Sequence, residues 1–513
     1  MPLDLETGRG LFLALLPELI LTAWALLLLL HVAWRHNEPG AQRQVGWLTL
    51  AGLGLAAAAV LWLWITGARV DGIPTSVAVD PFRWAASLIV LVGAALTTVV
   101  SIGYLEREGI AIPEYHVMVL FAVIGMLLLV GGADLLVVFL GLELMSVSVY
   151  VLAGINRKSR VSAEAALKYF LLGAFASAFF LYGIALVYGA TGSTKLAIIS
   201  IQVMGDDAMN NLMLAAGLGL LFIGFAFKVA AVPFHMWAPD VYDGAPTPVT
   251  AFMAASVKAA AFAAFVRLLL GAFAHQHAYW DQVIWWLAAI TMVVGNLVAL
   301  SQRSLKRMLA YSSVAHAGYL LAALVSGSLA GAAAFLYYLL FYTLVTVAAF
   351  TVVIAKGRGG ERDVTTDDLA GLAESDRFLA LVMAVSMLSL LGFPGTAGFI
   401  GKWYVLTSAT GAGYPVLAAV LVLTSVVSAG YYLPVIMAMY MKPRVHERAH
   451  EDVVLPGLVR RTLAAVIVVV LFFGILPNGI AGYGRLLDTA RAASHAFLPQ
   501  HIVPLATRPT ADQ

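Results

Sequence analysis

The chain has no cysteine among its 513 residues. Thiolate-held iron–sulfur clusters, cysteine zinc sites and disulfides are therefore excluded from it. Neither the G-x-G-x-x-G nor the G-x-x-x-x-G-K-[ST] pattern occurs, so the sequence shows no nucleotide-binding loop. We expect no cofactor and no metal in this chain, and any redox or nucleotide chemistry in partner proteins.

Charge is also scarce. Charged residues make up 11% of the chain and hydrophobic residues 62%, whereas a soluble domain has about 25% charged residues. The apolar runs are long enough to cross a bilayer and do not alternate, which indicates helices and excludes a barrel. The net charge of +2 favours neither nucleic acid nor an acidic ligand. The sequence therefore predicts an all-α integral membrane protein.

About fourteen transmembrane helices are expected, the first of them kept in the mature protein. Their approximate ranges are 11–34, 46–66, 82–104, 116–131, 133–153, 162–189, 209–236, 246–271, 280–300, 306–326, 330–355, 377–409, 414–441 and 459–477. Counted together with the first residues of the spans that follow them, the odd-numbered connections carry 18 of the 30 Lys and Arg residues, and the termini with the other connections carry six. Because positive loops stay in the cytoplasm, both termini are expected on the periplasmic side of a bacterial inner membrane.

Six basic residues are assigned to the spans and not to the connections, and Glu143 near the middle of its span is considered with them. Arg83 and Arg267 are near helix ends, where their side chains are expected to reach the membrane surface. The others are Glu143, Lys168, Lys228, Lys258 and Lys402. A charge at the centre of a membrane helix costs about 2.5 to 3.5 kcal/mol, so these five are expected to face one another or internal water.

Lysine at such positions favours proton transfer, because it can lose its proton on leaving water and arginine cannot. One stabilising ion pair between Glu143 and a lysine is the alternative, but it would explain two residues and not five. The set therefore predicts a hydrated polar axis that moves protons.

Two spans are interrupted by helix-breaking residues. Pro233 follows Lys228, and Pro394 and Gly395 precede Lys402. Broken helices in two halves of a transporter are typical of ion sites, because their free backbone groups bind charge. A proline kink that only aids packing is the alternative for either break.

Two histidine patterns differ in how strongly they indicate a function. His316 lies in mid-span and is either a link in a proton chain or a hydrogen-bonded core residue, a choice that the sequence leaves open. Residues 446–450 match H-E-x-x-H, the zinc-protease pattern, but lie in a short charged loop, so no zinc site is expected there.

Residues 227–250 resemble the antiporter-like subunits of proton-pumping NADH:quinone oxidoreductase, respiratory complex I. Further matching motifs lie at residues 16–19, 141–144, 304–313 and 392–402, so the resemblance covers most of the chain. Residues 240–246 are most similar to the subunit N branch. Lys402 also stands where subunit M is expected to carry glutamate.

The resemblance implies roles for the buried residues. Glu143 and Lys228 would form a switch pair, Lys258 would be the central lysine and Lys402 the exit-side lysine. Lys168 would be the family's sixth-helix lysine, and His316 would join the central chain.

The resemblance also implies two inverted five-helix repeats, helices 4–8 and 9–13, with the seventh and twelfth helices broken. The expected divisions are 1–115 for three N-terminal helices, 116–271 and 280–441 for the repeats, and 442–513 for a cytoplasmic loop, the last helix and a tail. Partners would be the other membrane subunits of the complex, including neighbouring antiporter-like subunits. NADH, FMN, iron–sulfur clusters and quinone would be held by partner subunits.

The function so implied is outward proton translocation, driven by quinone reduction elsewhere in the complex. A subunit of a multisubunit cation/proton antiporter is the alternative, because such antiporters use related proteins with similar lysines. A membrane spacer that conducts nothing is a third possibility, against which the five buried charges argue.

Overall fold

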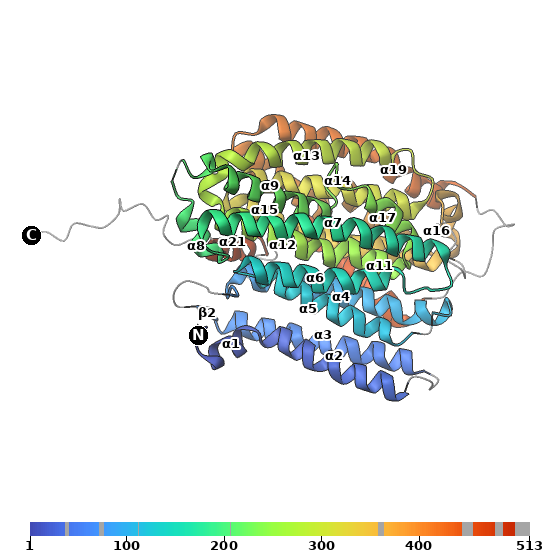
Figure 1. Ribbon diagram of the computed structural model, residues 1–513. Coiled ribbons are helices and arrows are strands. Elements are labelled where there is room, and N and C mark those ends of the chain that lie inside the picture. Colours follow the sequence, from blue (N-terminus) through green and yellow to red (C-terminus); the bar gives the residue numbers. More distant parts are fainter. Residues whose placement is uncertain are drawn as a thin grey trace, which may run out of the picture.

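The structure is a computed structural model that describes residues 1–35, 40–70, 76–110, 112–205, 207–357, 364–443, 455–477 and 486–497. Most of these residues are helical, and the long helices run side by side with roughly parallel axes (Figure 1). Within the described ranges, strands β1 (Pro2–Leu3) and β2 (Arg69–Val70) form one small parallel sheet. The H-E-x-x-H sequence at 446–450 lies outside the described residues.

Twelve helices of the described chain are long and apolar enough to cross a membrane. They are α2 (Leu16–Arg35), α3 (Ala41–Ile65), α4 (Pro81–Arg107), α5 (Glu114–Gly131), α6 (Leu135–Ala153), α7 (Arg160–Thr191), the composite helix Thr247–Ala272, the helix Ala274–Ala299 that contains α13 (His277–Ala299), α14 (Leu305–Val325), α15 (Leu329–Lys356), α19 (Pro415–Met441) and α20 (Gly457–Ile475). The all-α membrane fold expected from composition is confirmed.

Two shorter apolar helices are interrupted where the sequence indicates. Eight residues separate the end of α9 (Leu212–Lys228) from the start of α10 (Trp237–Gly244), and Pro233 is one of them. Helix α17 (Arg377–Leu391) is separated from α18 (Ala397–Gly411) by a segment that contains Pro394 and Gly395. Each break leaves helix-end backbone groups without intrahelical partners, and a buried lysine lies beside each.

The composite helix Thr247–Ala272 contains two π-helical turns that the sequence did not indicate. It consists of α11 (Thr247–Phe252), η2 (Met253–Val257), α12 (Lys258–Arg267) and η3 (Leu268–Ala272). Lys258 follows the first π turn directly. Such turns often mark functional positions in helices, but an apolar pattern cannot reveal them because nearly every residue of this helix is buried inside the protein.

Short elements complete the chain: α1 (Gly8–Ala14), α8 (Leu196–Gln202), α16 (Leu372–Ser375) and the 3-10 turns Ala208–Asn210, Ala274–Gln276 and Thr366–Leu369. A further helix, α21 (Leu486–Phe497), lies in the expected tail and packs against α4 and α15. Figure 1 places α1, α8 and α21 at one end of the molecule and α16 at the other.

Capping residues fix several helix starts. The side chains of Asp80, Asp134, Ser304 and Asp376 each accept a hydrogen bond from a backbone N–H in the first turn of the helix that follows. These groups satisfy donors that have no partner within the helix. The caps therefore set where α4, α6, α14 and α17 begin.

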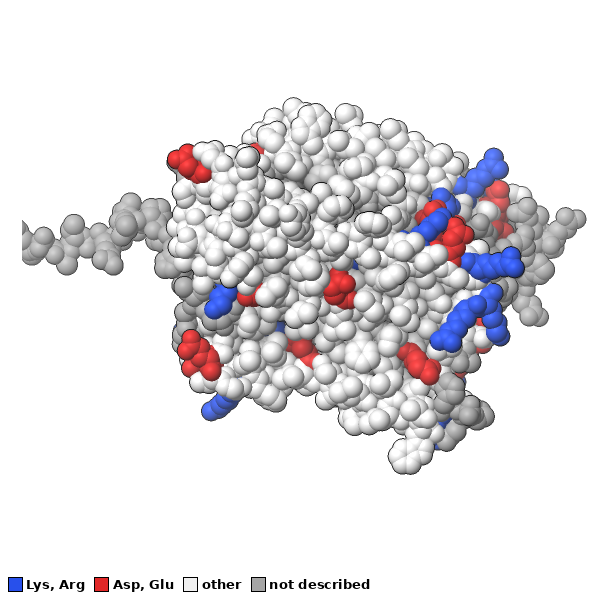
Figure 2. Space-filling model, in the orientation of Figure 1, with Lys and Arg blue, Asp and Glu red and all other residues white. Residues whose placement is uncertain are grey.

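The helices differ strongly in burial. The composite helix Thr247–Ala272, α14 and α15 are enclosed almost completely, whereas α2, α3, α7, α13, α19 and α20 leave more than half of their residues less than fully buried. White side chains cover most of the face in Figure 2, and Lys and Arg gather mainly at the end where α16 lies. Lys258 and Arg267 lie on the most enclosed of these helices.

Candidate functional site

Lys258 lies at the start of α12 and is only 2% exposed. Its Nζ donates to the backbone oxygen of Ser313 at 2.6 Å and makes a close hydrogen bond to the Ser313 hydroxyl. It also lies 5.8 Å from the ring centre of Tyr342. No carboxylate within the described residues forms an ion pair with it, so neutral oxygens and an aromatic face solvate this amine.

His316 lies one helical turn beyond Ser313 on α14 and is also 2% exposed. Its Nδ1 is 2.6 Å from the Tyr338 hydroxyl, and its Nε2 is 3.2 Å from the Tyr432 hydroxyl. The Tyr432 hydroxyl makes a further close hydrogen bond with Ser312. His316 is therefore held on both ring nitrogens, between α15 and α19.

Lys402 lies just after the break between α17 and α18. Its Nζ donates to the Leu391 backbone oxygen at 3.0 Å and to the Ser425 hydroxyl at 3.2 Å. It also lies 4.4 Å from the ring centre of Tyr319, one turn beyond His316 on α14. Leu391 is the last residue of α17, so Lys402 uses a carbonyl that the interruption leaves without an intrahelical partner.

Lys228 is the corresponding lysine at the other break and is the last residue of α9. Its Nζ donates to the Tyr150 hydroxyl at 3.2 Å and lies 5.1 Å and 5.4 Å from the ring centres of Tyr150 and Tyr169. The side chain is buried among aromatic rings. Lys228 and Lys402 are thus solvated in the same manner, by neutral oxygens and ring faces.

The expected pair of Glu143 and Lys228 is not formed in this structure. Glu143 is partly exposed and accepts a close hydrogen bond from Ser177 of α7. No nitrogen of Lys228 comes within 4.0 Å of its carboxylate. Glu143 and Lys228, which the family resemblance pairs, are therefore not in contact in this structure, because Lys228 donates its hydrogen bond to the Tyr150 hydroxyl.

Lys168 departs from the expectation of burial. Its side chain is 43% exposed and pairs with Glu164 at 2.7 Å and with Asp240 at 3.0 Å. Asp240 also pairs with Arg307 at 3.2 Å. Lys168 thus joins α7 to α10 in a surface ion network. It does not lie among the buried lysines, because it stands beside the buried stripe of α7 that contains Ala165 and Tyr169 and is not part of it.

The expectation that Arg83 and Arg267 reach the membrane surface is wrong. Arg83 is fully buried and pairs with Glu18 at 2.7 Å, and Arg267 is 5% exposed and forms two hydrogen bonds to Asp80, at 2.8 Å and 3.1 Å. Buried carboxylates hold both guanidinium groups inside. These carboxylates lie at distant positions in the sequence, so the pairing was not visible from spacing.

The hydroxyl groups around the axis were not predicted from the sequence. Ser313, Tyr338, Tyr342 and Tyr432 all contact Lys258 or His316, or a group bonded to them. Tyr338 and Tyr342 stand one turn apart, which places them on one face of α15. That spacing was the available signal, but tyrosines in an apolar helix are common and carry no charge.

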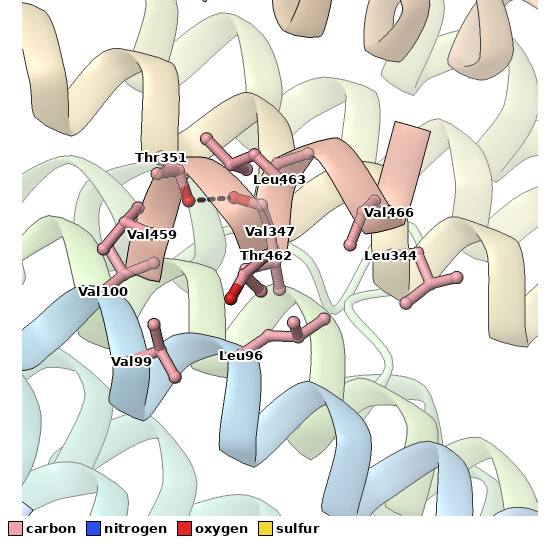
Figure 3. Close-up of a pocket in the computed structure, with 11 residues that line it drawn as sticks. Leu96, Val99, Val100, Leu344, Val347, Thr351, Val459, Thr462, Leu463 and Val466 are labelled. Atoms are coloured by element: carbon pink, nitrogen blue, oxygen red, sulfur yellow. Dashed lines mark hydrogen bonds between the residues drawn. The ribbon is translucent and has the colours of Figure 1, made fainter. Parts of the chain in front are cut away.

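Figure 3 shows a crevice elsewhere in the membrane domain, between α4, α15 and α20. Aliphatic side chains line it, apart from Thr351 and Thr462. No residue of the lysine and histidine axis is among its walls. The side chains of the axis are instead connected to one another by the hydrogen bonds and ring contacts described above.

Residues 132–428 match the family described as "NADH:quinone oxidoreductase/Mrp antiporter, TM". A protein of Gemmatimonas aurantiaca named NADH-quinone oxidoreductase subunit N is 46% identical, with 98% of this chain and 99% of that protein covered. A protein of the same name from Trichlorobacter lovleyi is 45% identical over 92% of this chain and 96% of its own length.

Solved structures agree with these relatives. A chain in the respiratory complex I of Thermus thermophilus is 38% identical, with a TM-score of 0.77 over 92% of this chain and 99% of that chain. A chain of the Mrp complex from Dietzia sp. DQ12-45-1b has a TM-score of 0.80 over 95% of this chain and 98% of that chain. At 22% identity it shows the common fold alone. Sequence and structure together place this chain in the NADH-quinone oxidoreductase subunit N family.

Proposed function

We propose that this subunit carries protons outward through the bilayer along Lys258, His316 and Lys402, driven by quinone reduction in partner subunits of complex I. Lys228, with Glu143 as its switch partner and Lys168 at the surface network, would load the first half of the path. The subunit binds no cofactor of its own in this proposal.

One observation carries the proposal. Lys228, Lys258 and Lys402 are 3%, 2% and 5% exposed, and none pairs with a carboxylate that the structure describes. A lysine placed in the protein only for stability would be expected to have a buried counter-ion, as Arg83 and Arg267 have. Uncompensated lysines can instead exchange protons with their neighbours.

The contacts also support a sequence of sites. Ser313, His316 and Tyr319 follow one another at one-turn intervals on α14, and they contact Lys258, the tyrosine hydroxyls and Lys402 in that order. A single helix face thus connects the lysine of α12 with the lysine of α18. This continuity supports a route across the centre of the protein.

The membrane arrangement belongs to the same proposal. Counting α9 with α10 and α17 with α18 as one crossing each gives fourteen crossings, with both termini on the periplasmic side of a bacterial inner membrane. The proposed repeats, 116–271 and 280–441, each contain one interrupted helix with an adjacent lysine. Residues 1–115 and 442–513 flank them.

Lys258→Ala in the assembled complex tests the function. Inverted membrane vesicles would report NADH-driven proton uptake and quinone reduction in one sample. We expect both to fall strongly, while Lys442→Ala, at an exposed lysine paired with Asp367, leaves both unchanged. Full pumping by Lys258→Ala would overturn the assignment. Sodium-dependent proton flux without NADH would favour the antiporter alternative.

A further inference from the structure

Lys258 and His316 do not touch, although both lie against α14. Lys258 contacts Ser313, and His316 lies one turn farther along the same helix. The facing helix α15 carries Tyr342 and Tyr338 at the same interval. Tyr342 therefore lies beside Ser313, and Tyr338 lies beside His316.

The two tyrosines divide the contacts between them. The Tyr342 hydroxyl donates to Ser313 Oγ at 2.8 Å, and the Tyr338 hydroxyl lies 2.6 Å from His316 Nδ1. The His316 ring also stacks on Tyr338, with ring centres 5.9 Å apart, and lies 5.1 Å from the Tyr342 ring. Both tyrosines are almost fully buried.

We propose that Ser313, Tyr342 and Tyr338 form a hydroxyl bridge that carries the proton between Lys258 and His316. The proposal rests on the proposed function, since it names the groups that join two of its sites. A hydroxyl both donates and accepts a hydrogen bond, so it can take up one proton and pass on another. Phenylalanine at either tyrosine position would keep the packing and break the chain.

The transfer conserves every proton. Protonated Lys258 gives a proton to Ser313 Oγ. Once the Tyr342 hydroxyl has turned its hydrogen away from Ser313, to which it donates in this structure, Ser313 passes its own hydroxyl proton to Tyr342, and Tyr342 passes its hydroxyl proton onward. In this proposal one water molecule takes the proton from Tyr342 and gives one of its own to Tyr338, as waters do between polar groups too far apart for direct contact. Tyr338 then gives its hydroxyl proton to His316 Nδ1. The net result is a neutral Lys258 and a protonated His316.

Tyr337 supplies a matched control on the same helix. It is as buried as Tyr338, but its hydroxyl donates to the Phe473 backbone oxygen at 3.0 Å, toward α20. A buried tyrosine hydroxyl generally needs some partner. Tyr337→Phe therefore removes the same atom from the same helix without touching the axis.

The experiment compares Tyr338→Phe, Tyr342→Phe and Tyr337→Phe in intact complex I in inverted vesicles, with complex content measured for each. We expect NADH-driven pumping to fall about tenfold in the first two, equivalent to about 1.4 kcal/mol in the barrier, and to stay near wild type in Tyr337→Phe. Ser313→Ala gives a second test if either tyrosine variant fails to assemble.

A double-mutant cycle with His316→Ala separates the bridge from a packing role. If Tyr338 acts through His316, Tyr338→Phe causes no further loss in the His316→Ala background. Additive losses, or pumping in Tyr338→Phe and Tyr342→Phe equal to Tyr337→Phe, would overturn the bridge while leaving the function intact. Full pumping by His316→Ala itself would instead overturn the proposed role of His316.

Discussion

Glu143 and Lys228 are separated in this structure, each held by a different hydroxyl group. Ser177 donates to the Glu143 carboxylate, and Lys228 donates to Tyr150, which lies two turns from Glu143 on the same helix. In the proposed switch this arrangement would be the open state, and closing it would require Lys228 to leave the Tyr150 hydroxyl.

Replacing Glu143 by Gln should lower proton pumping and coupled turnover, because an amide has no charge to attract Lys228. The measurement is NADH-driven proton uptake in inverted vesicles, normalised to assembled complex. Glu374→Gln, at an exposed position beyond the membrane helices, is the control and should behave as wild type. Unaltered pumping in Glu143→Gln would leave the carboxylate without a part in the path.

Gly392→Ala should impair pumping more than Gly395→Ala. Both glycines have positive φ, +85° and +89°, so both substitutions strain the backbone, by about 1 to 2 kcal/mol each. A Cβ at Gly392 would lie 2.9 Å from Lys402 Cδ, whereas at Gly395 no atom lies within 4 Å. The difference in proton pumping between the two variants, measured in inverted vesicles, reports the effect of displacing Lys402. Equal losses would mean that strain alone acts.

Removing one partner of the buried pair Glu18 and Arg83 should destabilise the subunit by about 3 to 5 kcal/mol, because the other charge is left buried. The measurement is thermal unfolding of the purified complex, in which the loss of this subunit from the complex reports its destabilisation. The double variant Glu18→Leu with Arg83→Leu should lose less stability than either single variant, because it leaves no unpaired buried charge. Asp488→Ala, in an exposed pair with Arg491, should change little.

Acid should weaken the link between Asp80 and Arg267. Burial alone would raise the pKa of Asp80, but the Arg267 guanidinium and the Arg83 backbone N–H together hold it below the ordinary value of 3.8. The unfolded chain thus binds the proton first, so this contribution to stability is complete above about pH 4 to 5 and disappears as the pH falls through the lower folded pKa.

The measurement is thermal inactivation of wild type and Asp80→Asn from neutral pH to below pH 4. The stability difference between them should be constant near neutral pH and shrink as the solution is acidified below pH 4. A difference that grows on acidification would contradict the lowered pKa. Asp367→Asn, at an exposed carboxylate paired with Lys442, serves as the control.

Hydropathy predicted the membrane helices because the bilayer requires long apolar segments whose backbone is satisfied internally. The expected span 116–131 corresponds to Glu114–Gly131, and 306–326 to Leu305–Val325. The breaks after Lys228 and before Lys402 could likewise be located, since proline and glycine disfavour helix locally. The π turns beside Lys258 could not, because they leave the apolar pattern unchanged.

The sequence by itself determined that this is a helical membrane protein, where its helices lie, and which charged residues lie within them. Only the tertiary structure decided how those charges are compensated. It gave Arg83 and Arg267 buried carboxylates, left Lys168 at the surface, and surrounded Lys258 and His316 with hydroxyls from α14, α15 and α19. The reason is physical. Whether a segment can cross a membrane depends on its own residues, whereas the solvation of a buried charge depends on neighbours contributed by other helices.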